Sequence, residues 1–190
     1  MVTENGEQMG NLAALILRVV LGGLMTGHGA QKLFGWWGGY GLDGTSAWLE
    51  SMGMRPGRSW AILAGTSEFG GGVLSLLGFL NPLGPLGVIG AMAMATRKAH
   101  WGKPIWVTEG GPELPVTNIS IATTLMLAGP GEYSLDRALG IRLPRWIALL
   151  GLVVIVFTTS LAGKMEPPTQ EGTEQARDEL QAEDKDRQQV

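Results

Sequence analysis

The stretch from Phe69 to Thr96, FGGGVLSLLGFLNPLGPLGVIGAMAMAT, decides the fold class of this chain, because its 28 residues include no charged side chain. A hydrocarbon core roughly 30 Å thick is crossed by about 20 mostly apolar residues in a helix that rises about 1.5 Å per residue. The segment Asn81-Pro82-Leu83-Gly84-Pro85 interrupts the stretch with residues that break helices. The stretch therefore predicts two antiparallel membrane helices joined by a tight turn.

Two further uncharged runs of 18 residues each lie at Leu114–Gly131 and Trp146–Gly163. Three such runs are rare in a soluble protein of 190 residues. We therefore predict an all-α membrane protein, built as a four-helix transmembrane bundle plus a fifth transmembrane helix. The expected helices span residues 12–34, 59–80, 83–99, 116–128 and 145–163.

The segments between these helices predict how the rest of the chain is organised. Residues 35–58 are rich in Gly and Trp, which is typical of an interfacial loop, and we expect a short helix near residues 46–52. Ser134 is expected to cap a short helix with Asp136 in its first turn. We divide the chain into a disordered lead (1–10), a four-helix core (11–140), the fifth transmembrane helix (141–165) and an acidic disordered tail (166–190).

Charge and cysteine content exclude several classes of function. The formal net charge of -3 combines a tail of net charge -5 (166–190) with a remainder of net charge +2. Neither part is basic enough to indicate nucleic-acid binding. The chain contains no cysteine, which excludes a dithiol relay, an iron–sulfur centre, a thiolate zinc site and a disulfide framework.

Alternate helices of a bundle run in opposite directions, so the position of a residue in the chain predicts its depth. We call the face with the N-terminus side A and the face with the first loop side B. Nearly every ionisable side chain expected at membrane depth falls in the half towards side B, which indicates a functional site there. Arg18 lies near side A, where we expect its side chain to extend to the lipid–water interface.

Glu68 lies in the second expected helix, on a face that otherwise carries small residues. The other members of this face, at spacings of three and four residues, are Ala61, Gly65, Gly72 and Ser75. Small residues let helices approach closely, so this face is expected to point into the bundle. A charge at the bilayer centre costs at least roughly 2.5–3.5 kcal/mol, so Glu68 must be protonated or paired, with Lys32 or His28 as its partner.

His28 and Lys32 lie one helical turn apart, and we predict that they converge on Glu68 as a catalytic polar triad. The alternative is that Lys32 extends to the interface, His28 bonds a backbone carbonyl and the acid is a structural pin. The expected quinone- or ligand-binding residues are His100, Trp101, Glu113 and Asn118. We expect neither a metal site nor a haem held between the two histidines.

Four stretches of the sequence resemble the DoxX family of small bacterial membrane proteins. They are HGAQKLFG at 28–35, EFGGG at 68–72 with His100 after it, GGPE at 110–113 and GPGEYSLD at 129–136. The resemblance covers residues 12–140 and implies a four-helix core in a multi-pass protein of the bacterial cytoplasmic membrane. The fifth helix and the acidic tail lie outside it.

Members of this family resemble the membrane subunit of a thiosulfate:quinone oxidoreductase, and others are associated with quinone detoxification. The resemblance therefore implies that quinone is the substrate, and that the lipid bilayer and a redox partner protein are the partners. Whether the chain forms a homo-oligomer is left open. No covalently bound cofactor is expected. Two other functions remain open, a non-catalytic scaffold that docks an oxidoreductase and a small-molecule transporter. The transporter is disfavoured because we find no inverted repeat.

Overall fold

The computed structural model describes residues 2–167, and every regular element within this range is a helix. The elements follow one another as α1 (Val2–Phe34), the 3-10 turn η1 (Trp36–Gly38), α2 (Gly41–Ser51), α3 (Gly57–Leu77), α4 (Leu83–Ala99), the 3-10 turn η2 (Val107–Glu109), α5 (Glu113–Ala128), α6 (Leu135–Leu139) and α7 (Trp146–Ala162). The all-α class predicted from the sequence is confirmed.

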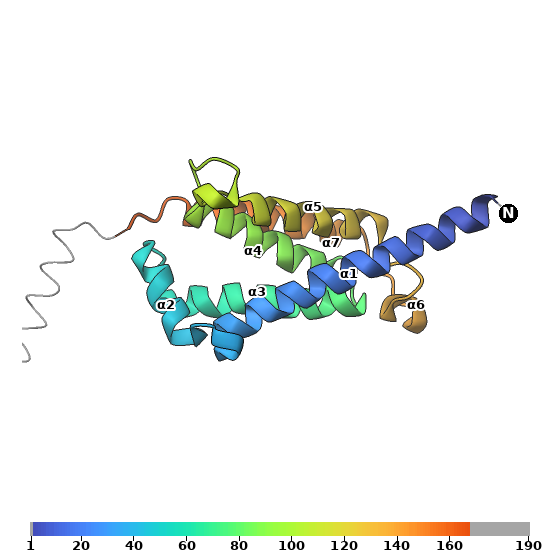
Figure 1. Cartoon of the computed structure of the whole chain (residues 1–190), viewed down its shortest axis with the longest axis horizontal. Coiled ribbons are helices and arrows are strands. Elements are labelled where there is room, and N and C mark those ends of the chain that lie inside the picture. The colour runs from blue at the N-terminus through green and yellow to red at the C-terminus, as the bar shows by residue number, and fades with distance from the viewer. Residues whose placement is uncertain (1, 168–190) are drawn as a thin grey trace, which may run out of the picture.

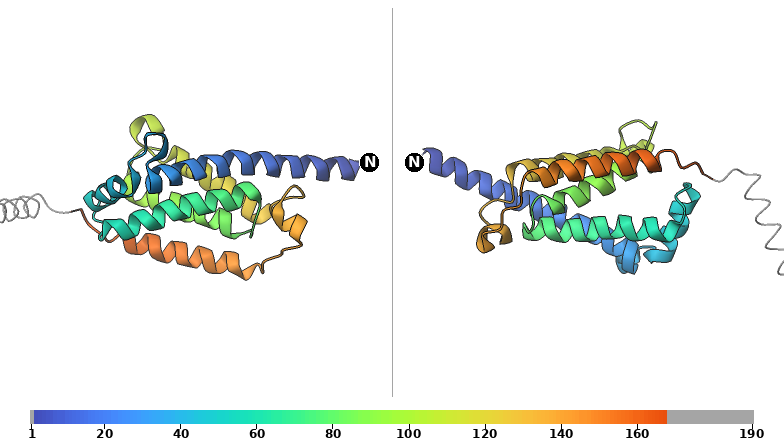
Figure 2. Two further views of the ribbon diagram at one scale, coloured as in Figure 1. Left: turned by 90° about the horizontal axis from the view of Figure 1, so that it is seen from below. Right: turned by 180° about the vertical axis from the view of Figure 1, so that it is seen from behind.

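The five long helices run along the length of the molecule, and the two short ones lie at opposite ends (Figure 1). The end with α2 corresponds to side B, and the end with α6 corresponds to side A. α1 extends past the other helices on side A, as all three views show (Figure 2). The turn between α3 and α4 lies at the predicted breaker, also on side A.

Helix boundaries lie close to those predicted, apart from the start of three helices. α1 begins at Val2, so the disordered lead predicted for residues 1–10 is wrong for the described residues. A nucleated helix propagates at little cost, and isolated glycines such as Gly6 and Gly10 cost only about 1 kcal/mol each. α5 begins a turn early, at Glu113, because Pro115 fits the first turn of a helix. α2 is also longer than expected.

The predicted cap of the short helix α6 is confirmed, since Arg137 N donates to Ser134 Oγ at 3.3 Å. The predicted acidic tail lies outside the described residues from residue 168 onwards.

α1 and α3 pack closely because glycines of each helix meet the backbone or side chains of the other. A Cβ atom on Gly29 would lie 2.6 Å from Phe69 Cα, and one on Gly72 would lie 2.7 Å from Thr26 Oγ1. The small-residue face of α3 therefore points inward as predicted, and it carries Glu68 with it. The main apolar core lies beside this contact and buries Leu21, Met25, Val88, Ile89, Met92, Ala122 and Leu125.

Two segments are long and apolar enough to cross a membrane, Asn5–Phe34 and Gly57–Leu77. α4 and α7 have 17 residues each and α5 has 16. Seventeen helical residues span about 25 Å, which is less than the roughly 30 Å of a hydrocarbon core. Over residues 2–167 the structure is thus all-helical with two candidate spans, and the four-plus-one transmembrane arrangement stays a prediction.

Candidate functional site

Lys32 and Glu68 form an ion pair between α1 and α3, in the half of the bundle towards side B. Lys32 Nζ donates a hydrogen bond to Glu68 Oε2. Glu68 is only 3% exposed, whereas Lys32 is partly buried, so the ammonium reaches the buried carboxylate from the edge of the bundle. The predicted contact between these two residues is confirmed. The carboxylate needs such a partner because moving an unpaired charge out of water is costly.

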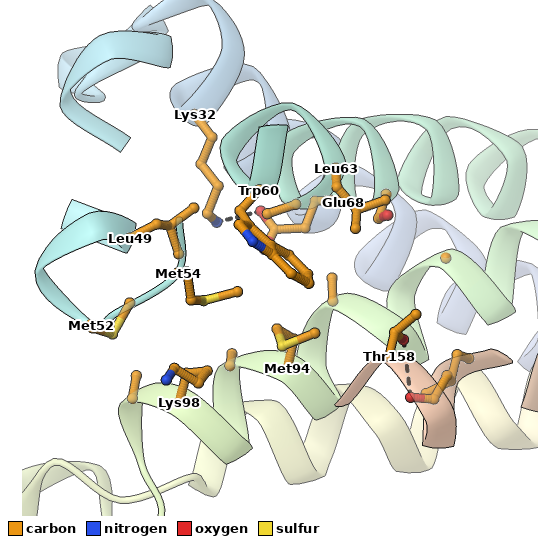
Figure 3. A pocket seen from close by; sticks show the side chains of 18 of the residues that line it. Lys32, Leu49, Met52, Met54, Trp60, Leu63, Glu68, Met94, Lys98 and Thr158 are labelled. Atoms are coloured by element: carbon orange, nitrogen blue, oxygen red, sulfur yellow. Dashed lines mark hydrogen bonds and ion pairs between the residues drawn. The ribbon is translucent and has the colours of Figure 1, made fainter. Parts of the chain in front are cut away.

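An apolar cavity of about 240 Å³, here called the inner cavity, adjoins this ion pair. It lies between α2, α3, α4 and α7, and Lys32 reaches it from α1 (Figure 3). The ring of Trp60 on α3 extends into it towards Met94 on α4. The ionisable side chains in its wall are Lys32, Glu68 and Lys98. The inner cavity is therefore an apolar chamber with one carboxylate and two ammonium groups in its wall.

Lys98 and Arg97 hold the end of α7 against the end of α4. Lys98 Nζ donates to Met165 O at 2.8 Å, and Arg97 Nη2 donates to Gly163 O at 3.3 Å. Both acceptors follow the last turn of α7, where carbonyl groups lack helical partners. α7 in turn completes the wall of the inner cavity with Val154, Ile155 and Thr158. The predicted fifth helix thus belongs to the site. Its mostly apolar sequence does not indicate which side of the helix lines the inner cavity.

A second cavity of about 530 Å³, here called the outer cavity, is more polar than the first. Lys32 and Trp48 line both cavities and so form the partition between them. His28 is exposed and lines the outer cavity only. The predicted triad is therefore corrected to a pair, because the long flexible stem of lysine reaches Glu68 and the shorter imidazole remains on the outer side.

The four expected ligand-binding residues do not line the inner or the outer cavity. His100 Nδ1 forms a hydrogen bond with Gly110 O at 2.6 Å, and Glu113 Oε2 accepts one from Val107 N at 2.9 Å, so both hold the α4–α5 loop. The guanidinium of Arg97 lies 4.5 Å from the ring centroid of the exposed Trp101. The structure therefore does not bring these residues together with Glu68, since chain position predicts depth but not direction around the bundle.

Asn118, the fourth of these residues, faces the main apolar core. Its Nδ2 lies 3.7 Å from Met25 Sδ and 3.6 Å from Met92 Sδ. These contacts give the amide weak acceptors where α1, α4 and α5 meet.

Arg18 was expected to extend to the interface, but it is buried at the side-A end of the bundle. Its Nη2 donates to Tyr133 O, on the segment before α6. Nearby, the carboxylate of Asp136 is also buried and accepts hydrogen bonds from Leu80 N and Asn81 N, both at 2.8 Å. The signal that could have identified Arg18 is its place among apolar residues inside a helix, because ionisable residues at membrane depth usually face the interior.

The described residues contain no group of three or more His, Cys, Asp or Glu side chains that could hold a metal ion. A comparison with known families matches residues 13–101 to the DoxX family. The match covers most of α1 and all of α2, α3 and α4, and so includes Lys32 and Glu68. The stretches at 110–113 and 129–136 lie outside it. No curated protein and no solved structure matches the chain.

Proposed function

Because the chain belongs to the DoxX family through residues 13–101, and this family suggests a membrane protein, we propose that it is a quinone-binding membrane subunit of a redox complex. The observation that carries the proposal is the Lys32–Glu68 ion pair in the wall of an otherwise mostly apolar cavity between helices. Small-molecule sites typically combine an apolar lining with a few convergent polar groups. Ionisable residues at membrane depth are functional by default.

We further propose that α1, α3, α4, α5 and α7 all cross the bacterial cytoplasmic membrane. α7 supports this arrangement because its large apolar side chains are exposed. They are Leu149, Leu150, Val153, Val154, Val156, Phe157 and Leu161. Exposed apolar surface of this extent is typical of contact with lipid or with a partner. The shorter helices cross where the bilayer thins around the protein.

The topology can be tested with single cysteines, because the chain has none of its own. Tyr40→Cys on side B and Leu139→Cys on side A replace exposed residues. We expect a membrane-impermeant maleimide to label one of them in intact spheroplasts and the other only after permeabilisation. Labelling of both positions before permeabilisation would contradict a bundle that crosses the membrane.

A quinone headgroup fits the chemistry of the inner cavity. Its flat ring can pack against Trp60, and its carbonyl oxygens can accept hydrogen bonds from Lys32. Reduction to a quinol takes two electrons, which a redox partner protein supplies, and two protons. Glu68 in its protonated form transfers a proton to a carbonyl oxygen, and Lys32 stabilises the negative charge that develops there.

The outer cavity supplies the protons in this proposal. Lys32 lines both the outer cavity and the inner one, and His28 is exposed and lines the outer cavity. A proton taken up on the outer side passes along Lys32 to Glu68, and each transfer to the quinone restores the ion pair. His28 thus acts at the proton entrance and not on the quinone.

Replacing Glu68 by glutamine is expected to lower partner-dependent quinone reduction in membranes at least about 100-fold, because an amide cannot transfer the proton. Folded protein should be retained, since the amide still accepts a hydrogen bond from Lys32. Glu109→Gln, at an exposed loop position, is the matched control and should keep wild-type turnover.

A binding measurement without the partner completes this test. Ala95 lines the inner cavity on α4, so Ala95→Phe places a ring inside it. We expect a short-chain quinone to quench the tryptophan fluorescence of the wild type and of the exposed variant Ala128→Phe, but not of Ala95→Phe. Full turnover in Glu68→Gln together with unchanged quenching in Ala95→Phe would refute the proposed site.

A second candidate is a scaffold that docks an oxidoreductase and performs no chemistry. It is favoured by the fact that Lys32 and Glu68 satisfy each other within the chain, as in a structural pin. Truncation after Pro167 separates the two functions. Loss of a co-purifying partner supports the scaffold, whereas loss of turnover with normal co-purification supports the quinone-reactive subunit.

A further inference from the structure

The inner cavity is too small to enclose a quinone together with a long hydrocarbon tail. Its volume is about 240 Å³, whereas pockets that enclose most of a drug-sized ligand measure about 300–1,000 Å³. The charged side chains in its wall also disfavour a hydrocarbon chain, which cannot solvate them. The inner cavity therefore holds a headgroup, and the rest of a longer ligand has to leave it through an opening.

The inner cavity is a groove along α4, with α3 on one flank and α7 on the other (Figure 3). Among the described helices, α3 and α7 each pack against α4 but make few contacts with each other. Leu63 on α3 and Val154 on α7 line the groove and are 49% and 50% exposed. Half-exposed wall residues lie where a cavity meets the outer surface. The groove is thus open between these two residues, and we call this gap the lateral opening.

The two ends of the groove are covered by packed side chains. Towards side A, Leu86 packs against α7, since a Cβ atom on Gly151 would lie 2.5 Å from Leu86 Cδ1. Towards side B, Met54 belongs to a buried apolar cluster of α2 and α3, and Met165 from the segment after α7 packs against this cluster. A tail therefore does not leave along the axis of the bundle.

The two remaining routes differ in polarity. The outer cavity is lined by the polar side chains of His28, Gln31 and Thr45, against which a hydrocarbon chain is unfavourable. Next to the residues of the lateral opening, Ile62 on α3 and Val153 on α7 are exposed and apolar. The surface at the lateral opening thus suits a hydrocarbon chain, and the outer cavity does not.

We propose that the inner cavity receives a lipid-borne quinone, whose headgroup enters from the bilayer through the lateral opening while its tail stays between α3 and α7. This inference rests on the proposed function, to which it adds the substrate class and the route of entry. The headgroup reaches Lys32 and Glu68 from the lipid side, and the outer cavity remains free for protons.

A photoreactive probe tests the route. The probe is a 1,4-benzoquinone with a decyl tail that ends in a diazirine, added to the full chain in phospholipid vesicles and illuminated. We expect the cross-links that excess tailless quinone suppresses to fall on exposed residues of α3 and α7 beside the lateral opening. Suppressible cross-links on the residues of the outer cavity or on residues 163–167, or none at all, would overturn the inference.

The tailless quinone distinguishes this failure from failure of the proposed function. If it does not quench the tryptophan fluorescence of the wild type, no quinone site exists and both proposals fall. If it quenches the wild type but not Ala95→Phe, while the suppressible cross-links lie away from the lateral opening, only the route and the substrate class are wrong.

Two neighbouring valines of α7 provide a matched pair of variants. Val154→Phe narrows the lateral opening and should raise the dissociation constant of the decyl quinone at least about fivefold, but not that of the tailless quinone. Val153→Phe, which does not line the inner cavity, should leave both constants unchanged. A Val154→Phe variant that affects both quinones equally, or neither, would overturn the inference.

Discussion

Replacing Lys32 by methionine is expected to lower the free energy of unfolding of the detergent-solubilised protein by about 3–5 kcal/mol. Glu68 is buried and its recorded ion-pair partner is Lys32, so the variant leaves a carboxylate that must stay charged without a partner or take up a proton. Methionine fills a similar volume and removes only the charge. Reversible denaturant unfolding in detergent measures the difference.

Two further variants show whether the loss comes from the buried charge. Adding Glu68→Gln to Lys32→Met should recover at least half of the lost stability, because the unpaired carboxylate is then gone. The exposed ion pair of Arg58 and Asp43 is the control, and Arg58→Met should cost no more than about 1 kcal/mol. A Lys32→Met variant that loses no more stability than Arg58→Met would mean that the carboxylate is solvated.

The second large effect is expected from adding one methyl group between α1 and α3. A Cβ atom on Gly29 would lie 2.6 Å from Phe69 Cα, so Gly29→Ala forces the two helices apart. Overpacking of this kind costs about 1–3 kcal/mol or more, and here the obstacle is largely backbone that cannot rotate away. We expect a corresponding fall in the thermal midpoint and in the yield of folded protein.

Gly27→Ala on the same helix is the matched control, because a Cβ atom there meets nothing within 4 Å. Alanine is the better helix former by about 0.5–1 kcal/mol, so this variant should be slightly more stable than the wild type. The two substitutions are chemically identical and lie two residues apart, yet their effects should have opposite signs. Equal effects would show that helix propensity, and not close packing, governs this face of α1.

The ion pair and the inner cavity together explain why an acid stays in the middle of an apolar helix. A buried ion pair is seldom more stable than apolar residues of the same volume. Its presence is therefore weak evidence for a purely structural role, and its position in the wall of a cavity favours a chemical one. The variants of Lys32 and Glu68 separate these roles, because stability and quinone turnover are measured independently.

Much of the fold followed from local features of the sequence. The breaker at Asn81–Pro85 predicted the α3–α4 turn, and the spacing of small residues predicted that Glu68 points inward. Both depend on interactions within a few residues along the chain. Helical periodicity determines which side chains share a face, and proline and glycine determine where a helix ends.

The helices, the buried face of α3 and a basic partner for its acid could thus all be predicted from the sequence. Packing between helices was needed to show that this partner is Lys32 and not His28, that α7 lines the inner cavity, and that Arg18 is buried at the other end. The reason is that periodicity is a property of each helix alone. Which neighbouring helix a side chain faces depends on contacts between helices that lie far apart in the chain.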